Sequence, residues 1–234
     1  MPSPASDRIR QEWLRRVEAE YRSSAITQQL TLWLTQLGAS PDLIRDGLRI
    51  SDDELAHAEL SFATYAAAGG TDAPRLARET LGVAESGDGL EADIVRTTVD
   101  VFCLGETVAV PLFRHLRERC TATEARAALD RILLDEVRHR DFGWTTLEWL
   151  LAQPIATDVR AQLDRELSLY FRRLRNAYGR VRATTDVTEE EAAWGLMAPH
   201  RYAEIVDRTW ERDYEPRFRK LGVDARNAWE AGVG

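Results

Sequence analysis

The chain has 234 residues, of which 44% are hydrophobic and 30% are charged, and it carries a formal net charge of -8. This length supports one sizeable hydrophobic core and is short for two, so we expect a single domain over residues 1–234. The acidic balance argues against a nucleic-acid-binding protein, which needs a basic surface to neutralise phosphates. The basic cluster FRRLR at 171–175 is interpreted as a solvated helix face.

Cysteine content and hydropathy exclude two further classes of protein. Cys103 and Cys120 are too few for a disulfide framework, and they form no CxxC pair. No stretch approaches the ~18 consecutive apolar residues of a transmembrane helix, and the opening residues, MPSPAS, lack the basic and apolar regions of a signal peptide. We therefore expect a soluble, cytoplasmic protein whose partners include neither a membrane nor a nucleic acid.

Two helices are predicted in the first third of the chain. The first spans about residues 8–37, and the second begins after Ser40, an N-cap followed by proline, and continues to about residue 69. Residues at helical spacing mark their inner faces: Trp13, Val17, Thr27 and Leu34 in the first helix, and Leu43, Gly47, Ile50 and Phe62 in the second. Residues 70–89 are rich in turn formers and predict a crossover that runs the length of a bundle.

Four further helices complete an all-α chain. The third spans about residues 90–119, where Pro111 lacks a backbone N–H and is expected to kink the helix. The pattern Thr121-x-x-Glu124 is a capping box that opens a fourth helix, which lasts until the approach to Pro154. Two more helices are expected near 157–179 and 188–221. Two antiparallel helix pairs joined by a long crossover predict a four-helix bundle with two additional C-terminal helices.

A repeated motif lies on the inner seams of the second and fourth helices. It reads DExxH in both copies, Asp53-Glu54-x-x-His57 and Asp135-Glu136-x-x-His139. Residues three apart on a helix project side by side, so each Glu–His pair can offer one oxygen and one nitrogen to a metal ion. The repeat therefore predicts a metal site inside the bundle.

The first and third helices each add one glutamate on the same seams. Glu20 lies between Val17 and Thr27, and Glu106 lies between Phe102 and Val110. At ~1.5 Å per residue, these glutamates and both motifs reach comparable heights in the bundle. Four buried carboxylates would be prohibitive unpaired, but two divalent ions cancel their charge. The predicted ligands, which are also the predicted catalytic residues, are Glu20, Glu54, His57, Glu106, Glu136 and His139.

Two of these ligands have structural alternatives. Glu54 could be the N3 residue of a capping box that starts at Ser51. Glu20 competes with Glu18 for the inner position, and either could be an ordinary surface residue.

Other chemically capable residues are interpreted as ordinary. His115 and His200 have no partner at the motif spacing, although His200 with Glu204 forms a reserve pair of ligands. Cys103 is expected to be a core residue. Tyr21, next to Glu20, could take part in redox chemistry.

The order E, ExxH, E, ExxH on four helices resembles the ferritin-like di-iron carboxylate superfamily, which includes rubrerythrins, bacterioferritins and many oxygenase or oxidase subunits. The segment from AEYRSS to ELSFA, with GET and DEVRH later, looks most like bacterial ferritin-like domain proteins of unassigned role. The resemblance covers about residues 8–152. It implies two iron ions, with manganese possible, bridged by the glutamates of the second and fourth helices.

The sequence departs from this family in two places. EYRSS stands where a histidine and a small residue are expected after the helix-one glutamate, so the surroundings of Glu20 differ. The chain has no rubredoxin-like CxxC pair, which argues against a self-contained rubrerythrin.

The predicted site suggests oxygen chemistry. Two neighbouring Fe(II) ions can each give one electron to O2, so we predict an O2-activating oxidoreductase, an oxidase or oxygenase, acting on a small organic substrate with a possible external electron donor. Asp135 is predicted to accept the spare N–H of His57, and Asp53 that of His139. The alternatives are an iron-handling ferroxidase or storage protein and a metal-free helical interaction protein.

The last two helices carry aromatic residues but no motif. We expect them to pack against the bundle and roof a pocket over the metals, in a monomer or homodimer. The residues concerned are Trp194, Tyr202, Trp210 and Tyr214.

Overall fold

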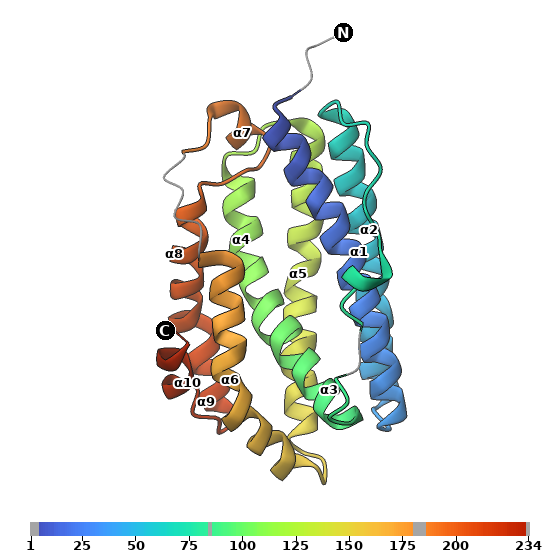
Figure 1. The fold of residues 1–234 in the computed structure, drawn as a ribbon, viewed down its shortest axis with the longest axis vertical. Helices are drawn as coiled ribbons and strands as arrows, with labels where there is room; N and C mark the ends of the chain where they lie inside the picture. The colour runs from blue at the N-terminus through green and yellow to red at the C-terminus, as the bar shows by residue number, and fades with distance from the viewer. Residues whose placement is uncertain (1–4, 84–85, 180–185, 233–234) are drawn as a thin grey trace. The chain divides into compact units, whose positions relative to one another are not determined.

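The computed structural model describes residues 5–83, 86–179 and 186–232, and within these ranges every regular element is helical (Figure 1). The all-α prediction is confirmed. The long elements are α1 (Asp7–Gln36), α2 (Pro41–Ala67), α5 (Thr123–Leu150) and α6 (Ala156–Gly179). Between α2 and α5 the chain forms η1 (Arg78–Thr80), α3 (Leu90–Thr97), η2 (Thr98–Glu106) and α4 (Thr107–Glu118). No helix in the described ranges combines the length and the apolar character needed to cross a membrane.

The chain forms two compact units, each assembled from separate segments. Unit 1 comprises Met1–Ala84, Phe113–Asp135 and Asp186–Met197, and unit 2 comprises Glu85–Leu112, Glu136–Thr185 and Ala198–Gly234. The chain passes from one unit to the other inside the continuous helices α4 and α5. The prediction of one domain therefore stays a prediction.

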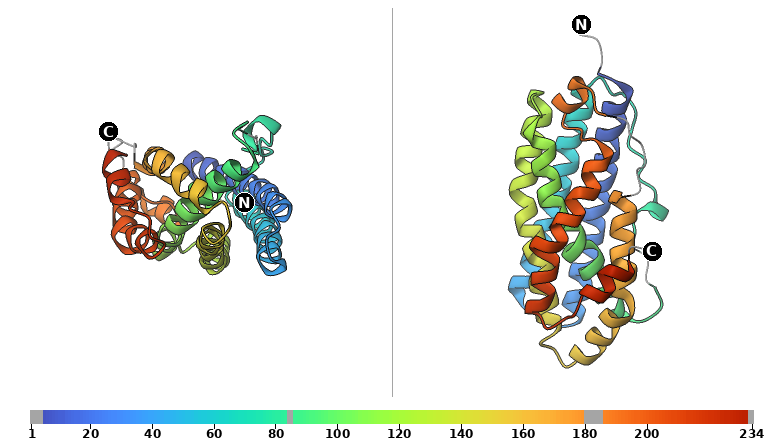
Figure 2. Two further views of the ribbon diagram at one scale, coloured as in Figure 1. Left: turned by 90° about the horizontal axis from the view of Figure 1, so that it is seen from below. Right: turned by 90° about the vertical axis from the view of Figure 1, so that its left-hand side faces the viewer.

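Helices α1 and α2 form an antiparallel pair in unit 1 and lie side by side in every view (Figures 1 and 2). Ser40 caps α2 by accepting the Leu43 N–H, with Pro41 in the first turn, as predicted. Gly47 of α2 lies so close to Thr31 of α1 that a Cβ at this position would overlap the threonine hydroxyl. The absence of a side chain at residue 47 thus lets the two helix backbones approach.

The segment after α2 runs along α1, as expected of a crossover. Its start is fixed where the Ala5 N–H donates to the Ala68 carbonyl at 3.0 Å. Farther along, the Arg75 N–H donates to Glu18 Oε1 at 2.8 Å, and Gly82 lies against Ile26. These contacts follow α1 in its own direction, from its first turns to its middle.

A π-helical segment, η2, interrupts the third long helix. The predicted kink was assigned to Pro111, but Pro111 lies inside the regular helix α4 and the irregular hydrogen bonding occurs earlier, at Thr98–Glu106. A π-helix winds more loosely than an α-helix and often occurs at functional sites. Here it ends at Glu106, one of the predicted ligands.

The capping box predicted at Thr121–Glu124 is wrong. Helix α5 begins at Thr123, and the Ala122 carbonyl accepts the first helical bond, from the Arg126 N–H. The N–H groups of Thr121 and Ala122 instead donate to the Ala193 carbonyl. A complete capping box occurs later, where Thr188 and Glu191 bond each other's backbone N–H groups at the start of α7.

The single helix predicted at 188–221 is divided into several shorter ones. These are α7 (Glu189–Ala193), α8 (Pro199–Thr209), the π-helical η3 (Trp210–Tyr214) and α9 (Glu215–Lys220), followed by α10 (Arg226–Ala231). Gly195 has a φ of 77°, a conformation that ends α7 and that L residues rarely adopt. Pro199 then starts α8, because a proline fits the first turn of a helix.

An aromatic core occupies unit 2, where α6 packs against α8 and α10 (Figure 2). The Trp210 and Trp229 rings stack with centroids 4.7 Å apart, and Phe171 meets both rings edge-on. Tyr214 is fully buried, and its hydroxyl donates to the Leu104 carbonyl at 2.6 Å. Trp210 and Tyr214 are thus core residues of unit 2, and their role as the roof of a pocket stays a prediction.

The other two aromatic residues of the predicted roof each have a partner within their own unit. Trp194 belongs to unit 1, where its carbonyl accepts the Trp13 indole N–H at 3.0 Å. Tyr202 stacks on Tyr178, with ring centroids 6.4 Å apart.

Candidate metal centre

Unit 1 brings together three of the predicted ligands. A carboxylate oxygen of Glu20, a carboxylate oxygen of Glu54 and a ring nitrogen of His57 all lie within 4.8 Å of one another. The residues are 8%, 1% and 0% exposed, respectively. Glu20, rather than Glu18, is therefore the helix-one glutamate that faces the interior, while Glu18 binds the crossover.

Glu54 is held from two sides. Its Oε1 accepts a hydrogen bond from the Ser23 hydroxyl of α1 at 2.8 Å, and its Oε2 lies 3.4 Å from His57 Nδ1. Because Glu54 lies well inside α2, it is not the N3 residue of a capping box with Ser51. Two ligand atoms of one ion at ~2.1 Å from the metal are typically about 3 Å apart, so the Glu54 and His57 atoms have a suitable separation.

The other ring nitrogen of His57 has a carboxylate partner. His57 Nε2 lies 3.2 Å from Asp135 Oδ2, which confirms the predicted pairing of these residues. Because an ionised carboxylate can only accept, this contact favours the tautomer with the proton on Nε2, and Nδ1 is then the nitrogen that faces Glu54. Arg131 Nε also donates to Asp135, which holds the carboxylate in place.

Unit 2 contains the other three predicted ligands, and each is buried. A carboxylate oxygen of Glu106, the last residue of η2, lies within 4.8 Å of a ring nitrogen of His139 on α5. Gly143, one turn beyond His139, explains this approach, because a Cβ there would lie 2.6 Å from the Phe102 carbonyl carbon. Glu136 precedes His139 by three residues on α5 and is 2% exposed.

The second predicted aspartate, Asp53, is also buried. Its Oδ1 lies 3.4 Å from Arg131 Nη2, so the same arginine contacts both aspartates of the two DExxH motifs. The pairing of Asp53 with His139 stays a prediction.

The reserve candidates lie elsewhere. His115 pairs with Glu118 at 3.7 Å on α4, and His200 is exposed. Glu204 forms a surface ion pair with Arg201 at 2.8 Å, and the pKa of its carboxyl is lowered chiefly by this hydrogen bond. Tyr21 is 38% exposed, whereas Glu20 beside it is buried.

Cys103 is a core residue, as predicted. Its side chain is fully buried, and burial raises the pKa of its thiol well above the usual value. The protonated thiol is a poor nucleophile and a poor metal ligand.

Two residues at the site were missed in the sequence. Ser23 and Arg131 contact Glu54 and Asp135 directly. Ser23 follows Glu20 by three residues, which places both on neighbouring parts of one helix face, so its position could have been inferred. Arg131 precedes Asp135 by four residues. At this spacing the two residues look in the sequence like an ordinary ion pair on a helix surface, so nothing marked Arg131 as part of the site.

The donor set of unit 1 fits a divalent transition metal. Glu20 and Glu54 supply two negative charges, and His57 supplies a neutral nitrogen with an oriented proton. Carboxylate and imidazole ligands together suit iron, manganese or zinc. Burial of two close carboxylates is costly unless a cation compensates their charge, so the composition and burial of the cluster agree with a bound ion.

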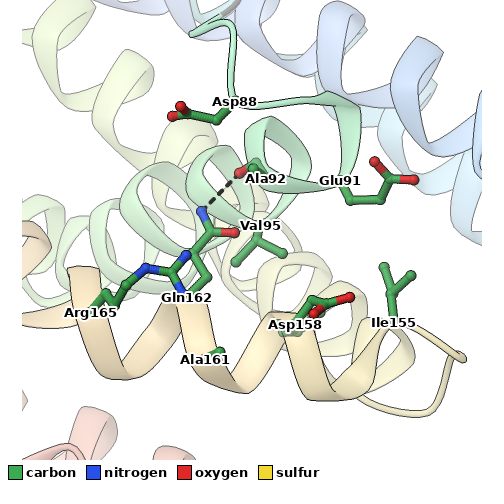
Figure 3. Close-up of a pocket in the computed structure, with 10 residues that line it drawn as sticks. Asp88, Glu91, Ala92, Val95, Ile155, Asp158, Ala161, Gln162 and Arg165 are labelled. Carbon is green, nitrogen blue, oxygen red and sulfur yellow. Dashed lines mark hydrogen bonds between the residues drawn. The ribbon is translucent and has the colours of Figure 1, made fainter.

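A separate surface cavity of about 210 Å³ lies in unit 2, at the first turns of α3 and α6 (Figure 3). Two of its lining residues are bonded to each other, because the Gln162 side-chain amide on α6 donates to the Ala92 carbonyl on α3 at 3.0 Å. The lining residue Val95 is about three helical turns, roughly 16 Å, from Glu106 along the third long helix. The cavity is thus distinct from the buried ligands.

Comparisons of the chain with protein families and with curated proteins found no match.

Proposed function

We propose that the protein is a ferritin-like di-metal carboxylate oxidoreductase, an oxidase or oxygenase that activates O2 and acts on a small organic substrate. Its expected cofactors are two iron ions, with manganese as the alternative metal. The observation that carries the proposal is the buried cluster of Glu20, Glu54 and His57, with Asp135 behind the histidine. Ferritin-like di-metal sites use this combination of isolated glutamates and ExxH motifs.

A second metal is supported by the remaining ligands. Glu106 and His139 approach each other, and Glu136 precedes His139 at the ExxH spacing. Helix α5 is continuous, so Asp135, which contacts His57, is followed directly by Glu136. We propose that Glu106, Glu136 and His139 hold the second ion.

The chain's own residues prepare the chemistry. A pair of redox-active ions would supply electrons to O2 when bound. Asp135 holds the proton on His57 Nε2 and keeps Nδ1 available, while Glu20 and Glu54 provide the negative charge that retains divalent ions. The near-complete burial of Glu54 and His57 keeps bulk water away from this chemistry.

Metal stoichiometry tests the site. Protein loaded anaerobically with Fe(II) should bind about two ions per chain, because six carboxylate and imidazole ligands are available. His57→Ala and His139→Ala should each lose at least one ion, whereas His115→Ala, a histidine outside the site, should retain both. Full loading of both site variants would refute the proposed centre, and absence of bound metal in the unaltered protein would favour a helical interaction protein.

Oxygen consumption and particle size separate an enzyme from a storage protein. We expect a monomer or homodimer whose Fe(II)-loaded form consumes about one O2 per site and then stops until an electron donor and a substrate are supplied. A ferritin-type storage protein would instead form a large shell and continue to oxidise and retain iron far beyond two equivalents. Size-exclusion chromatography with an iron titration therefore decides between the two.

A further inference from the structure

Three hydroxyl residues on α1 show the usual behaviour of such side chains in a helix, and two serines on the same helix do not. Thr27, Thr31 and Thr35 donate to the carbonyls four residues earlier, at 2.7–2.8 Å. This local bond is the default for a hydroxyl in a helix interior. Ser23 and Ser24 instead reach across to α2. Their hydroxyls therefore serve the contact between the two helices.

The two serines have different partners on α2. Ser24 donates to the Ser51 carbonyl at 2.9 Å and lies 3.1 Å from the Ser51 hydroxyl. Ser23 donates to the Glu54 carboxylate, at 2.8 Å from Oε1. Only Ser23 therefore contacts a residue of the proposed metal centre, and its bond to an ionised acceptor is the stronger kind.

From this geometry we propose that Ser23 is a positioning residue for metal binding: its hydroxyl holds Glu54 Oε1 and thereby directs Oε2 toward the ion shared with His57 and Glu20. The inference rests on the proposed function. Glu54 Oε2 already lies 3.4 Å from His57 Nδ1, so the held carboxylate presents one oxygen at ligand spacing. The ion then enters a site that needs no change of the Glu54 side-chain torsions.

The position of Ser23 makes it suited to this role. Its own carbonyl accepts the Thr27 hydroxyl, which adds a second contact to the same helical turn. Glu20 lies one turn earlier on α1, so one helix face supplies both a ligand and the support for the ligand on α2. The EYRSS segment, where the sequence departs from the family it resembles, thus contains the donor that orients Glu54.

The test compares Ser23→Ala with Ser24→Ala and Ser23→Thr. Co(II) and Mn(II) are titrated into the metal-free full chain, and affinity is measured by calorimetry together with the visible spectrum of bound Co(II). Loss of a residue that orients a metal ligand typically weakens binding 10–100-fold. We expect Ser23→Ala to weaken binding about tenfold and to change the Co(II) spectrum, and Ser23→Thr to restore both.

Ser24→Ala is the matched control for a purely structural effect. It removes the bond to the Ser51 carbonyl, so it should lower the melting temperature of the metal-free protein while leaving metal affinity and the Co(II) spectrum unchanged. Equal affinity and spectrum in Ser23→Ala and the unaltered chain would overturn the positioning role, as would equal weakening by both alanine variants. If the unaltered protein binds neither metal, the proposed function itself fails.

Discussion

Gly47 is a single residue on which the spacing of α1 and α2 depends. In a Gly47→Ala variant the new methyl group would overlap the Thr31 hydroxyl, so the helices would have to separate or Thr31 would have to move. Overpacking of this kind costs about 1–3 kcal/mol of the free energy of unfolding. Urea unfolding should show this loss, and the double variant with Thr31→Ala should recover part of it. A double variant as unstable as Gly47→Ala alone would contradict the steric explanation.

Cys103 offers a residue-scale prediction about reactivity. Because burial raises the pKa of its thiol, the side chain should stay protonated and resist iodoacetamide at pH 8 in the folded protein. A Cys120→Ser background leaves Cys103 as the single cysteine of the chain, so that any labelling is assigned to it. Mass spectrometry should find labelling only after unfolding in urea. Rapid labelling of the native protein would show that the core around Cys103 opens.

At this scale, side-chain spacing predicted which candidate ligands are buried better than it predicted the apolar packing around them. The seam positions of Glu20, Glu54 and His57 were correct because burial and helical period determine which face points inward. Phe62 was placed on the same inner face but is 44% exposed, since the neighbouring Ser61 occupies the buried position. Ser61 lies one turn after His57, and helical spacing alone does not distinguish a buried serine from an exposed one.

Among the elements, η2 gives a prediction about helical phase. Deleting Gly105 should let the π-helical segment tighten toward regular α-helix and turn Glu106 away from His139, because each residue of an α-helix rotates the chain by about 100°. We expect the bound metal to fall from about two ions to about one per chain, measured by elemental analysis.

Gly105→Ala is the matched control for this deletion. Among the described residues outside its own helical turn, the nearest atom to a Cβ at Gly105 would be the Asp100 carbonyl oxygen, at 3.7 Å, which is an ordinary contact. The substitution should therefore keep the helical phase and both ions. Two ions in the deletion variant would show that Glu106 is not placed by η2.

The start or end of a helix was predictable where neighbouring residues in the sequence determine it. It was not predictable where contacts between distant parts of the chain determine it. Ser40 followed by Pro41 fixed the start of α2, because the cap is local. The π-helical turns of η2 have no sequence signal in VFCLGE, and the tight contact of Phe102 with Gly143 involves residues far apart in the chain. Gly195 was overlooked as a helix terminator inside an otherwise periodic segment, although glycine supplies its positive φ.

For the molecule as a whole, metal binding should stabilise the fold. In the metal-free state Glu20 and Glu54 repel each other at close range, and an ion removes this repulsion. With free Mn(II) a hundredfold above its dissociation constant, unfolding should cost about 3 kcal/mol more than without metal. Urea denaturation with and without Mn(II) measures the difference, and a Glu54→Ala/His57→Ala variant should show a smaller one. Coincident curves for the unaltered chain would exclude a buried site.

The hydrogen bond from the Tyr214 hydroxyl to the Leu104 carbonyl limits how far the chain can be shortened from its C-terminus. A shortened chain that stops after α5 would retain all six proposed ligands, yet Leu104 would lose its buried partner just before Glu106. The Leu104 carbonyl would keep the backbone N–H of Thr107 as a partner, and the loss of one hydrogen bond costs about 0.5–1.5 kcal/mol at the turn that presents Glu106. A shortened chain built to carry the proposed metal site should therefore include the C-terminal helices, although they contribute none of the six proposed ligands.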